Sequence, residues 1–252
     1  MIVGWGSSSM ERIGPAMDWV LSGTGRWLDN VGRGGESSHH TAARIGALPP
    51  RLSFPKNVVP AAGSVPVESA LTHRGVALKP FAVAVAGVQG VLSHEDGVIL
   101  FTREAPGAAV PLDGPVPARS LRGPELASFD SLLWIGKNDL SDGADAAGVI
   151  ERTDATADWL TSHGARVLVL GHFVNTDAPA KQQHQVEIVN RAHGSRYGSH
   201  FLDINTPLRS ADIWSAIGLE ATEPDRREQT AGRKPIPISA GAAHHDMVGY
   251  SF

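Results

Sequence analysis

Two kinds of hydrophobic pattern alternate along the chain and predict strands and helices in turn. Apolar runs typical of strands buried on both faces of a sheet cover residues 132–136 and 166–171. Further strands are predicted over residues 2–5, 27–31 and 200–204. Amphipathic segments that predict helices cover residues 15–22, 38–45, 145–163, 180–192 and 212–217. Because strands alternate with helices, we expect an α/β fold in which helices cover both faces of a parallel sheet.

Residues 49–128 interrupt this alternation with a different pattern. Prolines and glycines separate short runs rich in β-branched residues, and no helical period is present. The strands that these runs predict cover residues 57–60, 75–79, 81–86, 88–93 and 97–103. The sequence Glu95-Asp96-Gly97 is typical of a hairpin turn. A segment of this length exceeds a plain loop, so we predict an inserted β-rich subdomain.

The predicted domain organisation therefore has two parts. Residues 1–48 and 129–252 form the α/β domain, and residues 49–128 form the inserted subdomain. Near the end of the α/β domain, residues 220–235 are polar and poorly patterned, which predicts an irregular segment. The insertion lies between the second and third predicted strands of the α/β domain. We therefore expect it near the edge of the sheet at which these two strands end.

Composition excludes several classes of function. The chain has 252 residues, of which 42% are hydrophobic and 19% charged, so a globular protein with a substantial core is expected. The formal net charge is −4 without a run of like charges, which excludes an obvious nucleic-acid footprint or polybasic membrane patch. There is no cysteine, which excludes disulfides, thiolate metal sites and cysteine nucleophiles.

Targeting signals are not visible in the sequence. The N-terminus lacks a basic region followed by an apolar stretch and a cleavage site, and no window approaches the ~18 apolar residues of a membrane span. Met1 leads directly into the first predicted strand. We therefore expect a natural start and a cytoplasmic protein, unless a signal was removed before this numbering.

Residues with catalytic chemistry follow three of the predicted strands. Ser8 lies in a run of three serines after the first strand, Gly35 in a glycine-rich turn after the second, and Asn138 after the third. In parallel sheets functional groups gather at the carboxyl ends of strands. A serine hydroxyl is a nucleophile, and backbone N–H groups and an amide can stabilise an oxyanion. Taken singly, each motif also fits an ordinary loop, a flexible turn or an Asx turn.

Taken in order, four stretches of the chain resemble the blocks of the SGNH (GDSL) hydrolase family. They are residues 2–10, 34–38, 136–139 and 244–250. The resemblance covers nearly the whole chain apart from the insertion. It implies a flavodoxin-like parallel sheet covered by helices and a serine esterase activity.

The resemblance also implies a role for each matched residue. Ser8 falls on the nucleophile, and the oxyanion hole is formed by Ser8, Gly35 and Asn138. His244 falls on the histidine that acts as the general base, five residues before the Gly-Tyr pair of the last block. Its neighbour His245 is an alternative base.

Two positions depart from the family pattern. Ser7 stands where the family usually has aspartate, and Gly241 stands where the aspartate that orients the histidine is expected. Asp246, a backbone carbonyl or water must then hold the imidazole. Loss of the orienting carboxylate can lower turnover up to ~10⁴-fold, so a slow enzyme is one expectation.

Other polar residues offer alternatives. His172 also follows a predicted strand and is a rival base. Arg33, next to the glycine turn, is a candidate for binding an anionic group of a substrate, or else a surface arginine. His39 and His40 are adjacent on a predicted helix and do not share a face, so no metal site is expected there.

We therefore expect a serine esterase that needs no cofactor or metal and acts on carboxylic esters, favouring acetyl esters of carbohydrates. A small-molecule or carbohydrate ester is the expected partner, without nucleic acid. The alternative is a catalytically weak SGNH-like protein that binds glycans or a cell surface through the insertion. A metal-dependent phosphoesterase is disfavoured because no ligands converge at a recognisable spacing.

Overall fold

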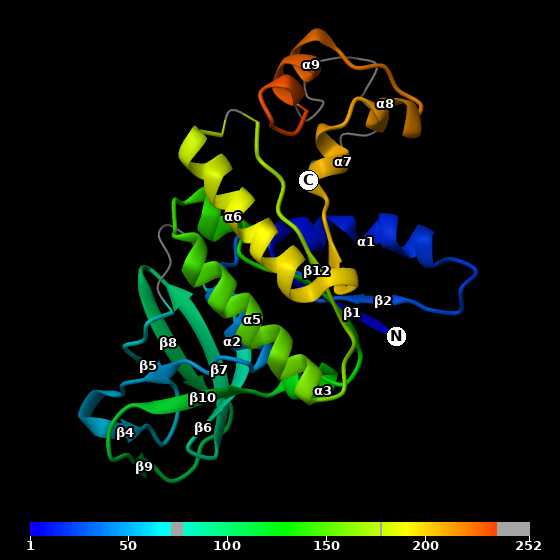
Figure 1. Cartoon of the computed structure of the whole chain (residues 1–252). Helices are drawn as coiled ribbons and strands as arrows, with labels where there is room; N and C mark the ends of the chain where they lie inside the picture. Colours follow the sequence, from blue (N-terminus) through cyan, green and yellow to red (C-terminus); the bar gives the residue numbers. More distant parts are fainter. Residues whose placement is uncertain (72–77, 177, 236–252) are drawn as a thin grey trace.

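The computed structural model describes residues 1–71, 78–176 and 178–235 (Figure 1). A five-stranded parallel sheet lies at its centre. Its strands are β1 (Ile2–Gly6), β2 (Leu28–Asn30), β11 (Asp130–Trp134), β12 (Val167–Leu170) and β13 (Phe201–Leu202). They lie in the order β2-β1-β11-β12-β13, and all neighbours are parallel. Numbered along the chain this order is 2-1-3-4-5, which is the flavodoxin-like arrangement.

Helices pack against both faces of this sheet. The longer ones are α1 (Ser8–Leu21), α2 (Ser38–Ile45), α5 (Ala146–Ser162) and α6 (Ala180–Tyr197). Shorter ones are α3 (Arg122–Leu126), α4 (Lys137–Ser141), α7 (Asn205–Arg209), α8 (Asp212–Ala216), α9 (Glu223–Thr230) and the 3₁₀ turns η1 (Pro55–Asn57) and η2 (Gly198–His200). Leu133 of β11 packs with Leu160 of α5, whereas Trp134 packs with Met10 of α1 on the opposite face. The predicted parallel sheet covered by helices is confirmed.

Strands from residues 51–66 and 81–120 form a second, antiparallel sheet (lower left of Figure 1). Its strands, in spatial order, are β3 (Arg51–Leu52), β10 (Val116–Ser120), β6 (Phe81–Val85), β7 (Val88–Glu95), β8 (Val98–Arg103) and β5 (Ser64–Pro66). Strands β4 (Val58–Val59) and β9 (Val110–Pro111) form a separate pair. The sheet has its own apolar core, centred on buried side chains such as Leu92 and Phe101. The division of the chain into two domains stays an interpretation.

The predicted hairpin turn is present between β7 and β8. Asp96 and Gly97 both have positive φ angles, 48° and 84°. This combination is typical of a type I′ turn, whose twist matches that of the flanking strands. Part of the strand expected over residues 75–79 lies outside the described residues.

Helix α1 begins at Ser8, seven residues before the predicted start at Pro15, so this prediction was wrong. Pro15 lies inside the helix and has no N–H to donate to the carbonyl of Glu11. The side chain of Asn30 replaces that donor. Its Nδ2 lies 3.2 Å from the Glu11 carbonyl oxygen and 2.8 Å from that of Met10. A residue from β2 therefore satisfies the helix backbone at the proline.

Residues 220–235 are also more regular than predicted, because α9 occupies much of this segment. Thr222 caps the helix, and its N–H donates to the Asp225 carboxylate at 2.9 Å in a reciprocal capping box. After the helix, Arg233 forms an ion pair with buried Glu228. The Thr-x-x-Asp pattern is a sequence signal for a helix start, and it was missed because the segment has few apolar residues.

Candidate active site

The turn between β1 and α1 places the serine run at the carboxyl end of the central strand. A Cβ atom on Gly6 would overlap the carbonyl oxygen of Trp134 and lie 2.8 Å from the Cβ of Met10. Glycine at this position therefore allows β1, β11 and α1 to meet closely. Ser8 is the first residue of α1 and is half-buried, whereas Ser7 and Ser9 are 2% and 4% exposed.

The N-terminus of α1 has no side-chain cap. Ser7 occupies the N-cap position, but its hydroxyl makes no capping hydrogen bond. That hydroxyl is buried and has no hydrogen-bond partner within the part of the chain that the structure describes. The first N–H groups of a helix have no intrahelical acceptor, and the helix dipole adds positive potential. Ser8 therefore lies at a helix end suited to a negatively charged oxygen.

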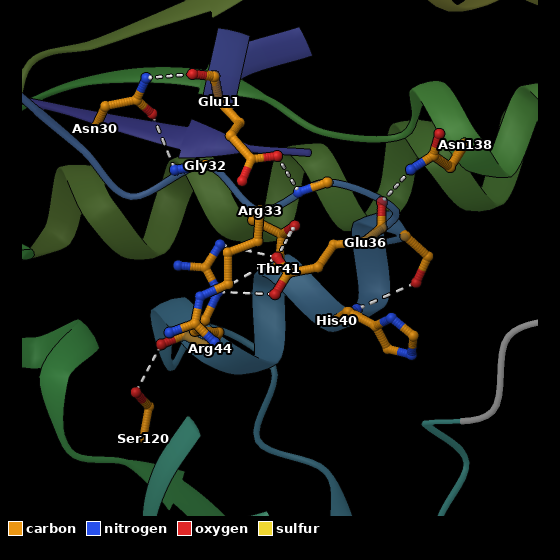
Figure 2. Close-up of polar contacts among 12 residues, drawn as sticks. Glu11, Asn30, Gly32, Arg33, Glu36, His40, Thr41, Arg44, Ser120 and Asn138 are labelled. Atoms are coloured by element: carbon orange, nitrogen blue, oxygen red, sulfur yellow. Dashed lines mark hydrogen bonds and ion pairs between the residues drawn. The ribbon is translucent and has the colours of Figure 1, made fainter. Parts of the chain in front are cut away.

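The glycine-rich loop after β2 lies against this serine. The Arg33 N–H donates to the Gly6 carbonyl at 2.9 Å. The Gly34 N–H donates to Oε2 of Glu11, which is drawn in Figure 2, at 2.8 Å. A Cβ atom on Gly34 would lie 3.6 Å from the Cβ of Ser8. Gly35 has a φ of +83°, a conformation that favours glycine. The loop therefore brings backbone groups next to Ser8.

Asn138 is tied to the same loop. Gly136 turns the chain after β11 with a φ of +104°, and Asn138 follows in α4. Its Nδ2 donates to the Glu36 carbonyl oxygen at 2.9 Å (Figure 2). An amide nitrogen carries two hydrogens, so the second remains for a ligand. Since β1 and β11 are adjacent, the structure brings Ser8, the glycine loop and Asn138 to one edge of the sheet.

A buried ion pair supports the loop. Oε2 of Glu36 lies 2.8 Å from Nη2 of Arg44 and 2.9 Å from Oγ1 of Thr41. Both charged side chains are almost completely buried. The pair anchors the loop to α2 and so positions the Glu36 carbonyl that accepts from Asn138 (Figure 2).

Asp139 connects three helices beneath Asn138. Its carboxylate accepts from both N–H and Oγ of Ser38 at 2.7 Å and from Nη2 of Arg152 at 3.1 Å. Because these partners belong to α2 and α5, the network fixes α4 relative to both. This network therefore holds in place the turn from which the Asn138 side chain extends.

The predicted base lies outside the described residues, together with His245, Asp246 and Gly241. The rival His172 is described, and it is 1% exposed. Its pKa is lowered well below the usual value by burial, with further effects of the charges on Lys137 and His193. A histidine with so low a pKa is a weak base at neutral pH, which argues against the rival role.

Two lysines near these elements were missed from the sequence. A Cβ on Gly34 would lie 3.8 Å from Nζ of Lys79, which precedes β6, so the antiparallel sheet brings a cation close to Ser8. Lys137 is buried beside the ring of Phe173, and burial lowers its pKa to about 7, with a further effect of the Lys234 charge. The position of Lys137 next to Asn138 could have drawn attention to it from the sequence. No local sequence pattern pointed to Lys79.

Comparisons with known proteins do not identify a family for this chain. No protein-family model and no curated protein sequence matches the chain. Among solved structures, a crystal structure of TesA aligns with 99% of this chain and 94% of its own, with 14% identity and a TM-score of 0.47. A similarity of this extent leaves function to be argued from the site itself. No helix in the described ranges is long and apolar enough to cross a membrane.

Proposed function

We propose that the protein is a serine esterase that hydrolyses carboxylic esters through an acyl-enzyme on Ser8. The observation that carries the proposal is the uncapped start of α1, where Ser8 faces a glycine loop to which Asn138 is hydrogen-bonded. This arrangement supplies a nucleophile and several N–H donors at one place. The same residues carry the resemblance to the SGNH hydrolases.

The proposed mechanism has two stages. Oγ of Ser8 attacks the ester carbonyl while His244 accepts the hydroxyl proton, and the helix N–H groups, Gly35 N–H and Asn138 amide stabilise the oxyanion. The tetrahedral intermediate expels the alcohol, which takes the proton from His244. Water, which gives a proton to His244, then attacks the acyl-enzyme, and His244 returns that proton to Oγ of Ser8 as the carboxylic acid leaves. His245 is the alternative base, and Asp246 is the proposed orienter of the imidazole.

Acetyl esters of carbohydrates are the proposed substrates. A short acyl group suits a nucleophile that is half-buried at the start of α1 beside the glycine loop. The low net charge of the chain also favours a neutral substrate. The proposed leaving group is therefore a sugar hydroxyl.

The test compares hydrolysis of nitrophenyl esters of increasing chain length by the wild type and by Ser8→Ala. Activity on the acetyl ester should be highest and should disappear in Ser8→Ala. Ser9→Ala is the matched control, because Ser9 lies in the same turn, and it should retain activity. Equal hydrolysis by the wild type and Ser8→Ala would refute the proposed nucleophile.

A second candidate is a catalytically weak SGNH-like protein that binds glycans or a surface through the antiparallel sheet. The observation that favours it is Ser7, which stands in place of the family's aspartate and has an unpartnered hydroxyl among the described residues. Glycan binding by wild type and Ser8→Ala alike, without ester hydrolysis, would select this candidate.

A further inference from the structure

A cavity lies where the two sheets meet, and three arginines line it. Arg33 comes from the loop after β2, Arg44 from α2 and Arg122 from α3. The cavity has a volume of about 240 Å³. Neither Ser8 nor Asn138 belongs to its lining, so it is separate from the proposed catalytic centre. Figure 2 shows the side chains of Arg33 and Arg44 extending away from Asn138.

The positive charge in this cavity is incompletely balanced. Arg44 is paired with Glu36 in a buried contact. Arg122 lies 3.4 Å from Asp29, and both side chains are partly exposed, so their interaction is weak. Arg33 forms no ion pair with a described residue, and its Nη1 donates only to the Pro80 carbonyl at 2.6 Å.

The surroundings of Arg33 make this imbalance unfavourable. Burial lowers the pKa of Arg33, and the charges of Arg44 and Arg122 lower it further against the opposing effect of Glu36. A half-buried cation that faces two other cations is stabilised by a bound anion. Guanidinium groups bind carboxylates through two parallel hydrogen bonds.

A buried indole forms part of the wall of this cavity. Trp5 lines the cavity and is 1% exposed, yet its indole N–H has no hydrogen-bond partner in the part of the chain that is described. A buried donor without an acceptor is destabilising. Its Nε1 is closed off from solvent, so the indole forms part of the cavity wall and does not donate to a bound ligand.

The size and walls of the cavity select the ligand. Its volume is below the ~300 Å³ at which drug-sized sites begin, so the ligand is small. Val31, Phe81 and Ala82 add apolar surface. We propose that this cavity binds a short-chain monocarboxylate, with its carboxylate on Arg33 and its alkyl tail against the apolar wall. This proposal does not depend on esterase activity.

The experiment is calorimetric titration of the full chain with butyrate, using both wild type and Ser8→Ala. We expect saturable binding with a Kd of about 1 mM, equal in the two proteins. Arg33→Gln should weaken binding about tenfold or more, and Arg33→Lys should also weaken it because the bidentate contact is lost. Ala82→Leu should weaken binding by narrowing the cavity while keeping the charges.

Arg26→Gln is the matched control, because Arg26 is an exposed arginine that pairs with Asp130 and does not line this cavity. It should leave butyrate affinity unchanged. Thermal unfolding of Arg33→Gln should show an intact fold. The absence of saturable butyrate binding, or equal affinity in wild type and Arg33→Gln, overturns the proposal. Saturable phosphate binding without butyrate binding overturns the assignment to monocarboxylates.

Discussion

At the scale of single residues, the three serines of the first turn differ in what surrounds them. Ser8 is half-buried against Gly34, whereas Ser7 and Ser9 are buried in the turn. A nucleophile must reach substrate, so exposure and position favour Ser8. The unpartnered hydroxyl of Ser7 is not explained by contacts among the described residues.

Asn138→Ala should lower kcat by roughly 10²–10³ with a smaller change in KM, because the proposed amide bond strengthens in the transition state. A modest loss of stability of ~1 kcal/mol should accompany it, since the bond to the Glu36 carbonyl disappears. Steady-state kinetics and urea unfolding measure the two effects. Asn175→Ala is the control, because the Asn175 amide donates to Ser141 in an exposed contact away from Ser8 and the glycine loop. Unchanged kcat in Asn138→Ala would leave the asparagine structural.

Lys137 should make stability depend on pH. Burial lowers its pKa to about 7, whereas an unfolded lysine has a pKa of ~10.4. Between these values the unfolded state binds more protons, so the free energy of unfolding rises with pH. Below pH ~7 the lysine is protonated in both states and this contribution to the slope disappears.

Urea unfolding at pH 7 and pH 9 tests this expectation. Lys137→Met should be more stable than wild type at pH 7, and its stability should rise less between the two pH values. Lys181→Met, which removes an exposed lysine of α6, should keep the wild-type slope. The same slope in Lys137→Met and wild type would contradict the assignment.

At the scale of elements, α1 depends on a residue from β2. Asn30→Ala should destabilise the protein by ~1–3 kcal/mol, because the Met10 and Glu11 carbonyls lose their side-chain donor. The loss should be smaller in a Pro15→Ala background, since alanine restores a backbone N–H to the Glu11 carbonyl. A double-mutant cycle by urea unfolding measures this coupling. Additive losses would show that Asn30 does not compensate for the proline.

The elements also show which structural features the sequence can predict. The apolar runs over residues 132–136 and 166–171 overlap β11 and contain β12, so the pattern alone identified these two strands. The start of α1 could not be placed, because Pro15 is typical of a first helical turn and its compensation by Asn30 is a tertiary contact. At the site, the sequence placed Ser8 and Asn138 after two predicted strands, and the structure shows that these strands are adjacent. The Asn138–Glu36 bond depends on how α2 and α4 pack, which no local pattern encodes.

At the scale of the whole molecule, the antiparallel sheet extends the proposed active site. Lys79 is an exposed residue before β6, yet its Nζ lies close to Ser8. A Cβ atom added to Gly34 would be 3.8 Å from Nζ of Lys79 and 3.6 Å from the Cβ of Ser8. The Glu11 carboxylate is nearer to this position, at 2.7 Å, so the Lys79 charge offsets that anion, and its reversal should make the surroundings of Ser8 more repulsive to anionic groups on a substrate. In exposed surroundings its effect is ~1 kcal/mol and is screened by salt.

Lys79→Glu should therefore change the preference between charged and neutral acyl groups. We expect kcat/KM for the nitrophenyl ester of a dicarboxylic acid, relative to the neutral ester of similar length, to fall by roughly fivefold or more, and the effect to shrink at high ionic strength. Lys56→Glu is the matched control, because it reverses an exposed lysine in the same part of the chain. If both variants change the ratio equally, general charge rather than Lys79 controls it. If neither does, the antiparallel sheet contributes no charge to substrate selection at Ser8.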